Sequence, residues 1–262
     1  MQIFDTHAHY DDAAFDADRE ALLDSLPAQG VAAVIAAAVD PDSSRRTLAL
    51  AHRYPGFLWA AVGVHPEAVI HATDDWLRTV YDLSRDPLCC AIGEIGLDYH
   101  YEDAAPREVQ REWFRRQLAL AGERGLPVVI HDRDAHEDTL KILEEYKPRG
   151  VVHCFSGSVE MMRQLTGWGL YIGLGGVVTF KNARRAVEVA AAVPADRLLL
   201  ETDAPYLAPE PCRGQRCHSG LIAHTARRLA EIRGTDADTL CRQTFDNACR
   251  LFGVTPSKGE TG

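Results

Sequence analysis

The sequence contains no run of about 18 apolar residues, the length that a membrane-spanning helix requires. Its start, Met1-Gln2-Ile3-Phe4-Asp5, has no basic segment followed by an apolar one, so no secretory signal is visible. Seven cysteines form an odd set without the spacing of a disulfide scaffold, which is typical of a reducing compartment. We therefore expect a cytoplasmic protein that has no membrane partner.

The chain also lacks an excess of positive charge. Its 28 lysines and arginines stand against 38 aspartates and glutamates, and the formal net charge is −10. Proteins that capture nucleic acid over a broad surface need a basic face, so this charge argues against an extended DNA-binding footprint. It remains compatible with a nucleic acid that is bound locally at metal ions. No feature indicates an obligate protein partner.

Linkers, low-complexity tracts and internal repeats are absent as well. What the sequence has is a regular alternation of strand-like and helix-like segments. The expected strands cover residues 3–9, 31–39, 57–64, 88–95, 128–131, 151–153, 170–174 and 197–202. The expected helices cover residues 16–29, 43–53, 75–84, 107–124, 135–146, 161–168, 184–193, 222–232 and 237–252.

This alternation predicts an α/β protein built as a single (β/α)₈ TIM barrel. The length of 262 residues fits that fold, for which roughly 250 residues are typical. A doubly wound open sheet is the structural alternative, although it usually has fewer strands. We expect one barrel domain over residues 1–254 and a short flexible tail over residues 255–262.

Five of the expected strands end in residue types that bind metals. The carboxyl-terminal ends of the strands form the active site of a barrel, so these side chains should converge there. Imidazoles and carboxylates together suit divalent first-row metals. The candidate ligands, in chain order, are His7, His9, Glu94, His131, His153 and Asp203.

Each candidate also has a purely structural interpretation. His7 and His9 are two residues apart and face the same side of a regular strand, but a solvated surface strand would show the same spacing. Glu94 interrupts an apolar strand, where a carboxylate is costly unless it binds a metal or pairs with a cation such as Arg133. His131 by itself would be read as a core histidine; the repetition at successive strand ends favours a metal site.

Asp203 and Glu201 compete for one role at the end of the eighth expected strand. Strand alternation turns both side chains to the same side, so periodicity does not separate them. Asp203 lies nearer the strand tip and is therefore the expected ligand. Glu201 is expected deeper in the barrel, as a partner that supports the ligands.

With these motifs in place, the chain resembles the TatD family of metal-dependent hydrolases, within the amidohydrolase superfamily. The matching motifs follow the family's order from near the first residue to beyond residue 207. They are Asp5-Thr6-His7-Ala8-His9, Gly63-Val64-His65-Pro66, Gly93-Glu94-Ile95-Gly96-Leu97-Asp98, His131-Asp132-Arg133-Asp134-Ala135, His153-Cys154-Phe155-Ser156-Gly157 and Glu201-Thr202-Asp203-Ala204-Pro205-Tyr206-Leu207.

The resemblance implies a barrel that holds two divalent metal ions. His7, His9 and Asp203 match the ligands of the first ion, and the second is matched by the pair His131 and His153. Glu94 matches a bridging carboxylate, in the position where phosphotriesterase-type enzymes have a carboxylated lysine. The implied activity is that of a TatD-like deoxyribonuclease, an exonuclease that uses a hydroxide activated by two metals. Glu94 and Asp203 would be its catalytic residues, with Asp203 accepting or orienting the proton. Magnesium, manganese and zinc all remain open.

One loop departs from the family pattern. Many TatD-like proteins have a basic loop ending in Arg-Asn-Glu-Pro after this last motif, whereas here Cys212 to Ser219 lack that ending. Cys212, Cys217 and His218 allow a zinc clip, but no second cysteine pair accompanies them, which favours unpaired loop thiols. The candidate substrate contacts near the strand ends are His65, Asp98, Arg133, Lys181 and Arg213.

The predicted function is metal-dependent hydrolysis of phosphodiester bonds, with DNA or a small phosphodiester as substrate. An amidohydrolase that acts on a small ester, lactone or amide is the nearer alternative, and the acidic chain does not oppose it. A non-catalytic metal-binding scaffold is the other alternative. Buried carboxylates at positions 94 and 203 argue against it, because a scaffold has no need of such costly groups.

Overall fold

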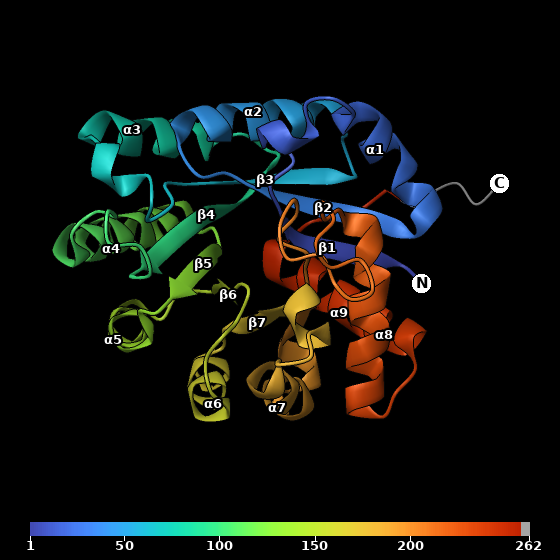
Figure 1. Cartoon of the computed structure of the whole chain (residues 1–262). Coiled ribbons are helices and arrows are strands. Elements are labelled where there is room, and N and C mark those ends of the chain that lie inside the picture. Colours follow the sequence, from blue (N-terminus) through green and yellow to red (C-terminus); the bar gives the residue numbers. More distant parts are fainter. Residues whose placement is uncertain (258–262) are drawn as a thin grey trace.

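Eight parallel strands follow one another in chain order around a single sheet in the computed structural model, which describes residues 1–257 (Figure 1). Each strand pairs in parallel with the next one along the chain. The strands are β1 (Ile3–Ala8), β2 (Val31–Ala37), β3 (Leu58–Val62), β4 (Cys89–Asp98), β5 (Val128–Arg133), β6 (Gly150–Val152), β7 (Tyr171–Leu174) and β8 (Leu198–Leu200). The expected α/β barrel is confirmed. Residues 258–262 of the expected tail lie outside the described residues.

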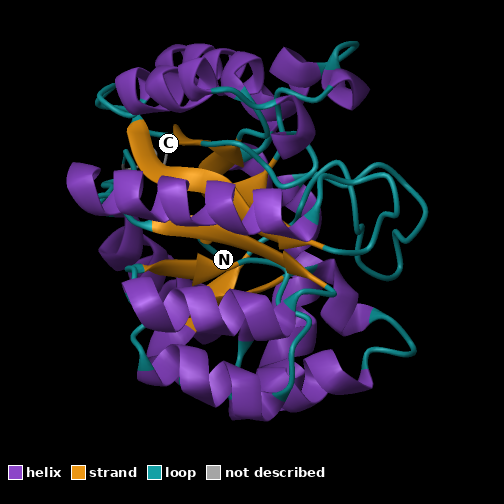
Figure 2. Ribbon diagram, turned by 90° about the vertical axis from the view of Figure 1, so that its left-hand side faces the viewer, coloured by secondary structure: helices purple, strands orange, loops and turns teal. Residues whose placement is uncertain are grey.

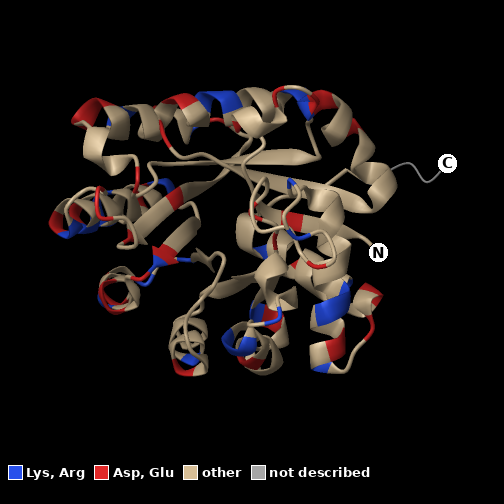
Figure 3. Ribbon diagram, in the orientation of Figure 1, with Lys and Arg blue, Asp and Glu red and all other residues tan. Residues whose placement is uncertain are grey.

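Helices connect the strands and surround them, as Figure 2 shows from the side. The α-helices are α1 (Arg19–Ser25), α2 (Pro41–Arg53), α3 (Asp74–Leu83), α4 (Arg107–Arg124), α5 (His136–Tyr146), α6 (Val159–Gly167), α7 (Arg184–Ala192), α8 (Ile222–Arg233) and α9 (Ala237–Phe252). Short 3₁₀ helices are η1 (Ala13–Phe15), η2 (Pro27–Gln29), η3 (Val69–His71), η4 (Gly176–Thr179), η5 (Ala195–Arg197) and η6 (Ser219–Leu221). Charged residues lie mainly on the helices and loops (Figure 3). Within residues 1–257, no helix is both long and apolar enough to span a bilayer.

The barrel closes where β1 meets the segment that follows β8. Ala8 and Ala204 form a parallel bridge, and the His9 N–H donates to the Ala204 carbonyl at 2.7 Å. Three residues before His9, the Thr6 hydroxyl donates to the Leu200 carbonyl at 2.9 Å. The ends of the first and last strands are thereby joined at the edge where the candidate ligands lie.

The opposite end of the barrel is filled by apolar side chains and covered by α9. Phe4, Trp59 and Leu199 lie near the starts of their strands, and they pack in one cluster with Leu251 and Phe252 of α9. Since the apolar filling occupies the amino-terminal ends of the strands, the carboxyl-terminal ends are left for polar side chains.

Several boundaries differ from the sequence-based prediction by one to three residues, and two of these differences have a clear cause. The helix expected over residues 16–29 is broken into α1 and η2, because Pro27 has no N–H to continue the α-helical hydrogen bonds. The strand expected over residues 197–202 ends earlier, with β8 at Leu200. The Thr202 N–H then donates to the Asp5 carboxylate rather than to a neighbouring strand. The residues that follow β8 are therefore positioned by this side-chain contact together with backbone hydrogen bonds to β1 and His9.

Candidate metal centre

Glu94 lies at the centre of the gathered side chains, and its two carboxylate oxygens face different neighbours. Its Oε2 atom is 3.2 Å from His7 Nε2 and 3.5 Å from His9 Nε2. Its Oε1 atom is 2.7 Å from His153 Nε2 and 2.8 Å from His131 Nδ1. Only 2% of Glu94 is exposed, so this carboxylate is desolvated and surrounded by imidazoles. The arrangement assigns one pair of histidines to each oxygen.

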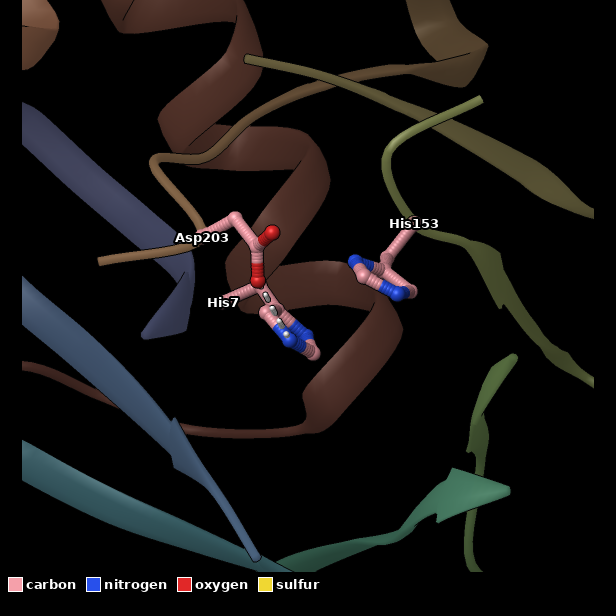
Figure 4. A group of neighbouring side chains, drawn as sticks. All are labelled: His7, His153 and Asp203. Atoms are coloured by element: carbon pink, nitrogen blue, oxygen red, sulfur yellow. Dashed lines mark ion pairs between the residues drawn. The ribbon is translucent and has the colours of Figure 1, made fainter. Parts of the chain in front are cut away.

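The β1–β8 side consists of His7, His9 and Asp203. The two histidine Nε2 atoms lie 3.1 Å apart, as the spacing on the strand led us to expect. Asp203 Oδ1 is 3.4 Å from His9 Nε2 and 3.6 Å from His7 Nε2. Figure 4 shows His7 and Asp203 together with His153, which comes from the segment after β6. Three side chains from distant parts of the chain thus place ligand-type atoms around one point.

The second set, which we call the β4–β6 side, consists of His131 in β5 and His153 directly after β6, and His65 lies beside them. The atoms His131 Nδ1 and His153 Nε2 lie 3.3 Å apart. His65 follows β3, and its Nε2 atom is 3.4 Å from Glu94 Oε1. The His153 ring also stacks on the His7 ring, with 3.9 Å between ring centroids, so His153 lies between the two sides.

His65 joins the candidate ligands, although we had expected it only as a substrate contact. Among residues 1–257, three groups of side chains bring metal-type ligand atoms within 4.8 Å of one another. They are His7, His153 and Asp203; His7, His9 and Glu94; and His65, Glu94 and His131. The available signal was position, because His65 also follows an apolar strand.

Hydrogen bonds behind two of the histidines fix which ring nitrogen faces the centre. His9 Nδ1 lies 2.9 Å from the Ala37 carbonyl, which can only accept, so Nδ1 carries the proton and leaves the Nε2 lone pair toward Glu94. His131 Nε2 lies 3.0 Å from Asp98 Oδ2, so the other ring nitrogen of His131, Nδ1, faces Glu94. Such outer partners orient metal-binding imidazoles in proteins. The converging lone pairs and carboxylates therefore fit divalent cations.

In the absence of a cation, carboxylates make two of these imidazoles basic. Burial lowers the pKa of His9, but Asp203 and Glu94 outweigh burial and raise it to about 9. Burial also lowers the pKa of His131, and hydrogen bonds to Asp98 and Glu94 raise it to about 10. In the absence of a cation, each ring therefore carries a second proton at neutral pH, on the nitrogen that faces Glu94, and a cation must displace that proton.

The pKa values of two neighbouring groups, His7 and Glu94, are instead lowered. Burial, and then the nearby His153, lower the pKa of His7 to about 4. Burial would raise the pKa of Glu94, but His153, His65 and His7 hold it well below its usual range. A neutral His7 and an ionised Glu94 are the protonation states that a metal site needs.

The Asp5 carboxylate accepts four hydrogen bonds that connect the segments of the β1–β8 side. Its Oδ1 atom accepts the backbone N–H groups of His7 and Thr202 at 3.2 and 3.0 Å. Its Oδ2 atom accepts the hydroxyls of Thr202 and Ser219 at 2.7 and 2.6 Å. The Ser219 N–H and hydroxyl both meet the Tyr10 hydroxyl. Ser219 belongs to the loop that departs from the family pattern, so this loop supports the centre through Asp5.

Strand alternation does not explain how the Asp203 side chain is directed toward the centre. β8 has already ended, and Asp203 adopts a left-handed backbone conformation with φ of +67°. Its N–H donates to the His7 carbonyl at 3.0 Å. Glu201 instead turns behind His153, where its Oε1 accepts the Cys154 N–H and lies 4.0 Å from His153 Nδ1. The alternation argument was wrong in its geometry, because both residues lie outside the strand.

A cavity of about 1310 Å³ opens above the centre. This volume exceeds the roughly 300–1,000 Å³ of ordinary small-molecule pockets. Its wall includes every candidate ligand except His7, together with Arg133, Arg46 and two tyrosines, Tyr101 and Tyr206. A ligand larger than a single small molecule therefore has room to reach the gathered imidazoles and carboxylates.

The expected substrate contacts occupy different places. Arg133 lines the cavity and donates to the Tyr101 hydroxyl at 3.1 Å, rather than pairing with Glu94. Asp98 is buried behind His131 and does not line the cavity. Lys181 and Arg213 are exposed outside the cavity wall, and the Arg213 guanidinium lies 4.2 Å from the centroid of the Phe180 ring.

The loop thiols do not form a metal group in the part of the chain that the structure describes. All seven cysteines are unpaired, and no group of three metal-type ligands includes Cys212, Cys217 or His218. Cys217 is buried, and its N–H donates to the Pro205 carbonyl at 2.9 Å. This thiol therefore packs the loop against the segment after β8.

Comparisons with known proteins agree with this geometry. Residues 4–253 match the family model described as TatD related DNase. The chain is 39% identical over 255 residues to a Bacillus subtilis protein named as an uncharacterized metal-dependent hydrolase, YabD; the match covers 96% of this chain and 99% of the relative. It is 35% identical over 260 residues to the 3'-5' ssDNA/RNA exonuclease TatD of Pectobacterium carotovorum, covering 95% and 99% of the two chains.

The fold is likewise similar to that of solved structures. The crystal structure of YJJV, a TatD homolog from Escherichia coli, superposes with a TM-score of 0.91 at 34% identity. The match covers 96% of this chain and 98% of that one. The similarity therefore extends over the barrel and includes every segment that contributes to the centre.

Proposed function

Because this chain belongs to the TatD family of metal-dependent hydrolases, which act on ester bonds, we propose that it is a nuclease that hydrolyses phosphodiester bonds in DNA as an exonuclease. The proposal rests on one observation: the two carboxylate oxygens of Glu94 face two separate sets of imidazoles. Two cations bridged by one carboxylate are the arrangement that stabilises both the attacking and the leaving oxygen of a phosphodiester.

We assign the ligands by the oxygen of Glu94 that they face. His7, His9 and Asp203 would hold one cation. His131 and His153 would hold the other, and His65 lies close enough to add a further nitrogen. Glu94 would bridge the two. The donor types suit magnesium, manganese or zinc, with the imidazoles favouring the softer end of that series.

Bound divalent cations supply two things here: they lower the pKa of water, and they offset the negative charge that develops on the phosphoryl oxygens. Asp203 would accept the proton of the attacking water at the carboxylate oxygen that does not hold the cation. Burial raises the pKa of Asp203, but the hydrogen bond from His9 and the charges of His7 and His153 lower it below its usual value, so the carboxylate is ionised and able to accept.

Arg133 is the cation best placed to orient the substrate. Its guanidinium lies on the cavity wall, and the residue follows His131 by two positions. A guanidinium binds phosphate oxygens through paired N–H donors, so Arg133 can hold a phosphate next to the reacting one. The net charge of −10 leaves such local contacts as the main attraction for a polyanion.

The proposal is tested with purified protein on 5'-labelled single-stranded DNA, before and after chelation and after addition of one divalent metal at a time. We expect chelation to abolish hydrolysis and a divalent metal to restore it. A panel of small esters, lactones and amides is assayed in parallel. Turnover of the panel by the metal-replete protein, with none of DNA, would contradict the nuclease proposal and favour an amidohydrolase.

A further inference from the structure

Two exposed tyrosines line the cavity above the candidate metal centre. Tyr101 is 46% exposed and Tyr206 is 55% exposed. In the described part of the chain, the other large apolar side chains that are exposed are Met1, Ile70 and Tyr146, and none of these lines the cavity. Aromatic rings left open to water are therefore found at the place where a substrate enters.

The two rings flank the centre from different sides. Tyr206 follows Asp203 by three residues, and its ring centroid is 6.4 Å from that of His9, on the β1–β8 side. Tyr101 follows β4 and receives a hydrogen bond from Arg133, which lies two residues after His131 on the β4–β6 side. A phosphodiester bound between the two sets of ligands would therefore have one tyrosine toward each of its two nucleotides.

The surroundings of the rings suit stacking. The Arg133 guanidinium lies 5.0 Å from the centroid of the Tyr101 ring, so it can keep that ring in place while it faces a phosphate. The Tyr206 hydroxyl donates to Asp12 Oδ2 at 3.2 Å, which anchors that ring at its edge, and the residue stays 55% exposed. Every nucleobase has a π-face, and aromatic side chains bind single strands by stacking on successive bases.

We propose that Tyr101 and Tyr206 form two base-stacking subsites, one on each side of the cleaved phosphodiester. This inference rests on the proposed nuclease function and deepens it. In a duplex, both faces of each base are covered by neighbouring base pairs; only an unpaired or terminal strand offers faces to the tyrosines. The two rings therefore select single-stranded nucleic acid and contribute to its binding.

The test combines variants with abasic substrates. Tyr101→Ala and Tyr206→Ala are compared with wild type on a short single-stranded DNA that has both bases beside the first cleaved bond. They are then compared on versions that lack the base 5' or 3' of that bond. On the intact strand we expect each variant to lose about 5- to 150-fold in kcat/KM, the range for one stacked base. Each loss should disappear on one abasic substrate only, and on a different one for each tyrosine.

Three controls accompany the test. Tyr101→Phe and Tyr206→Phe keep the ring and should retain most of the activity. Tyr146→Ala removes a tyrosine that is 39% exposed at the end of α5 and should change none of the rates. The metal content of each alanine variant should equal that of wild type, because neither hydroxyl contacts a candidate ligand atom.

Losses that are equal on intact and abasic strands, or no loss on the intact strand, would overturn the stacking subsites. Failure of the proposed function gives a different result. In that case the metal-replete wild type would cleave none of these strands, intact or abasic.

Discussion

On the β1–β8 side of Glu94, the segment that contains Asp203 is joined to β1 by several hydrogen bonds, whereas on the β4–β6 side one carboxylate orients the ring of His131. The Asp203 N–H donates to the His7 carbonyl, and Asp5 accepts the N–H groups of His7 and Thr202. The backbone of His131 is held by the pairing of β4 with β5, and the outer nitrogen of its ring faces the Asp98 carboxylate.

Exposure does not separate the two sides. The side chains of Asp203 and His131 are 18% and 16% exposed, whereas His7 and His153 are buried. A backbone network distributes the positioning of a ligand over several bonds, and a single outer carboxylate concentrates it in one. We therefore expect the cation on the β4–β6 side to be the more easily lost of the two. Four predictions test this comparison.

Glu94→Gln should have the largest effect, because it removes the charge that both sides share. We expect both cations to be lost and turnover to fall by more than the roughly 10²–10⁴-fold that one acid–base group contributes. Metal content is measured by elemental analysis, with Glu123→Gln, an exposed carboxylate on α4, as the charge-matched control. If the Glu94→Gln variant retained one cation per chain, the Glu94 carboxylate of the wild type would hold a cation on one side only.

Asp203→Asn should have the next largest effect. The amide keeps one ligand oxygen but cannot accept the proton, so we expect turnover to fall by roughly 10²–10⁴-fold. Some metal should stay bound through His7, His9 and Glu94. Glu201→Gln, behind His153, should cost only roughly 10–100-fold in affinity or activity. The opposite ranking of the two variants would reverse the roles of Asp203 and Glu201.

Asp98→Asn tests the weaker side directly. It should reduce the affinity for one cation by roughly 10–100-fold, since the amide orients His131 less firmly, and leave the other cation in place. Ser219→Ala is the matched change on the β1–β8 side. It should change both affinities little, because Asp5 still accepts three other hydrogen bonds. Competition titration with a metal indicator measures both, and equal effects of the two variants would remove the distinction between the sides.

The sequence was sufficient to predict the barrel and the convergence of the main ligand candidates, because both depend on local regularities. Apolar runs spaced along the chain indicate the strands, and a polar residue at a strand end lies at one edge of the barrel. His7 and His9 met as expected because two residues is the period of a strand.

What the sequence did not reveal depends on pairs that are distant along the chain. Asp5 and Ser219 are 214 residues apart, and no periodicity connects them. Asp98 was expected at the substrate but lies behind His131, because only the parallel pairing of β4 and β5 places one against the other. His65 was visible as a strand-end histidine, yet its approach to Glu94 requires the closed barrel.

The smallest expected effect is the release of protons when the cations bind. Carboxylates raise the pKa of His9 to about 9 and that of His131 to about 10, so at pH 7 each ring carries a proton that a cation must displace. Binding should release about one proton on each side, and affinity should rise about tenfold per pH unit for each proton, up to the pKa of that ring. Calorimetry in buffers of different ionisation enthalpy measures the number released. His131→Ala should reduce that number by about one while leaving the β1–β8 side able to bind. Proton release that is unchanged in this variant would mean that His131 is not a ligand.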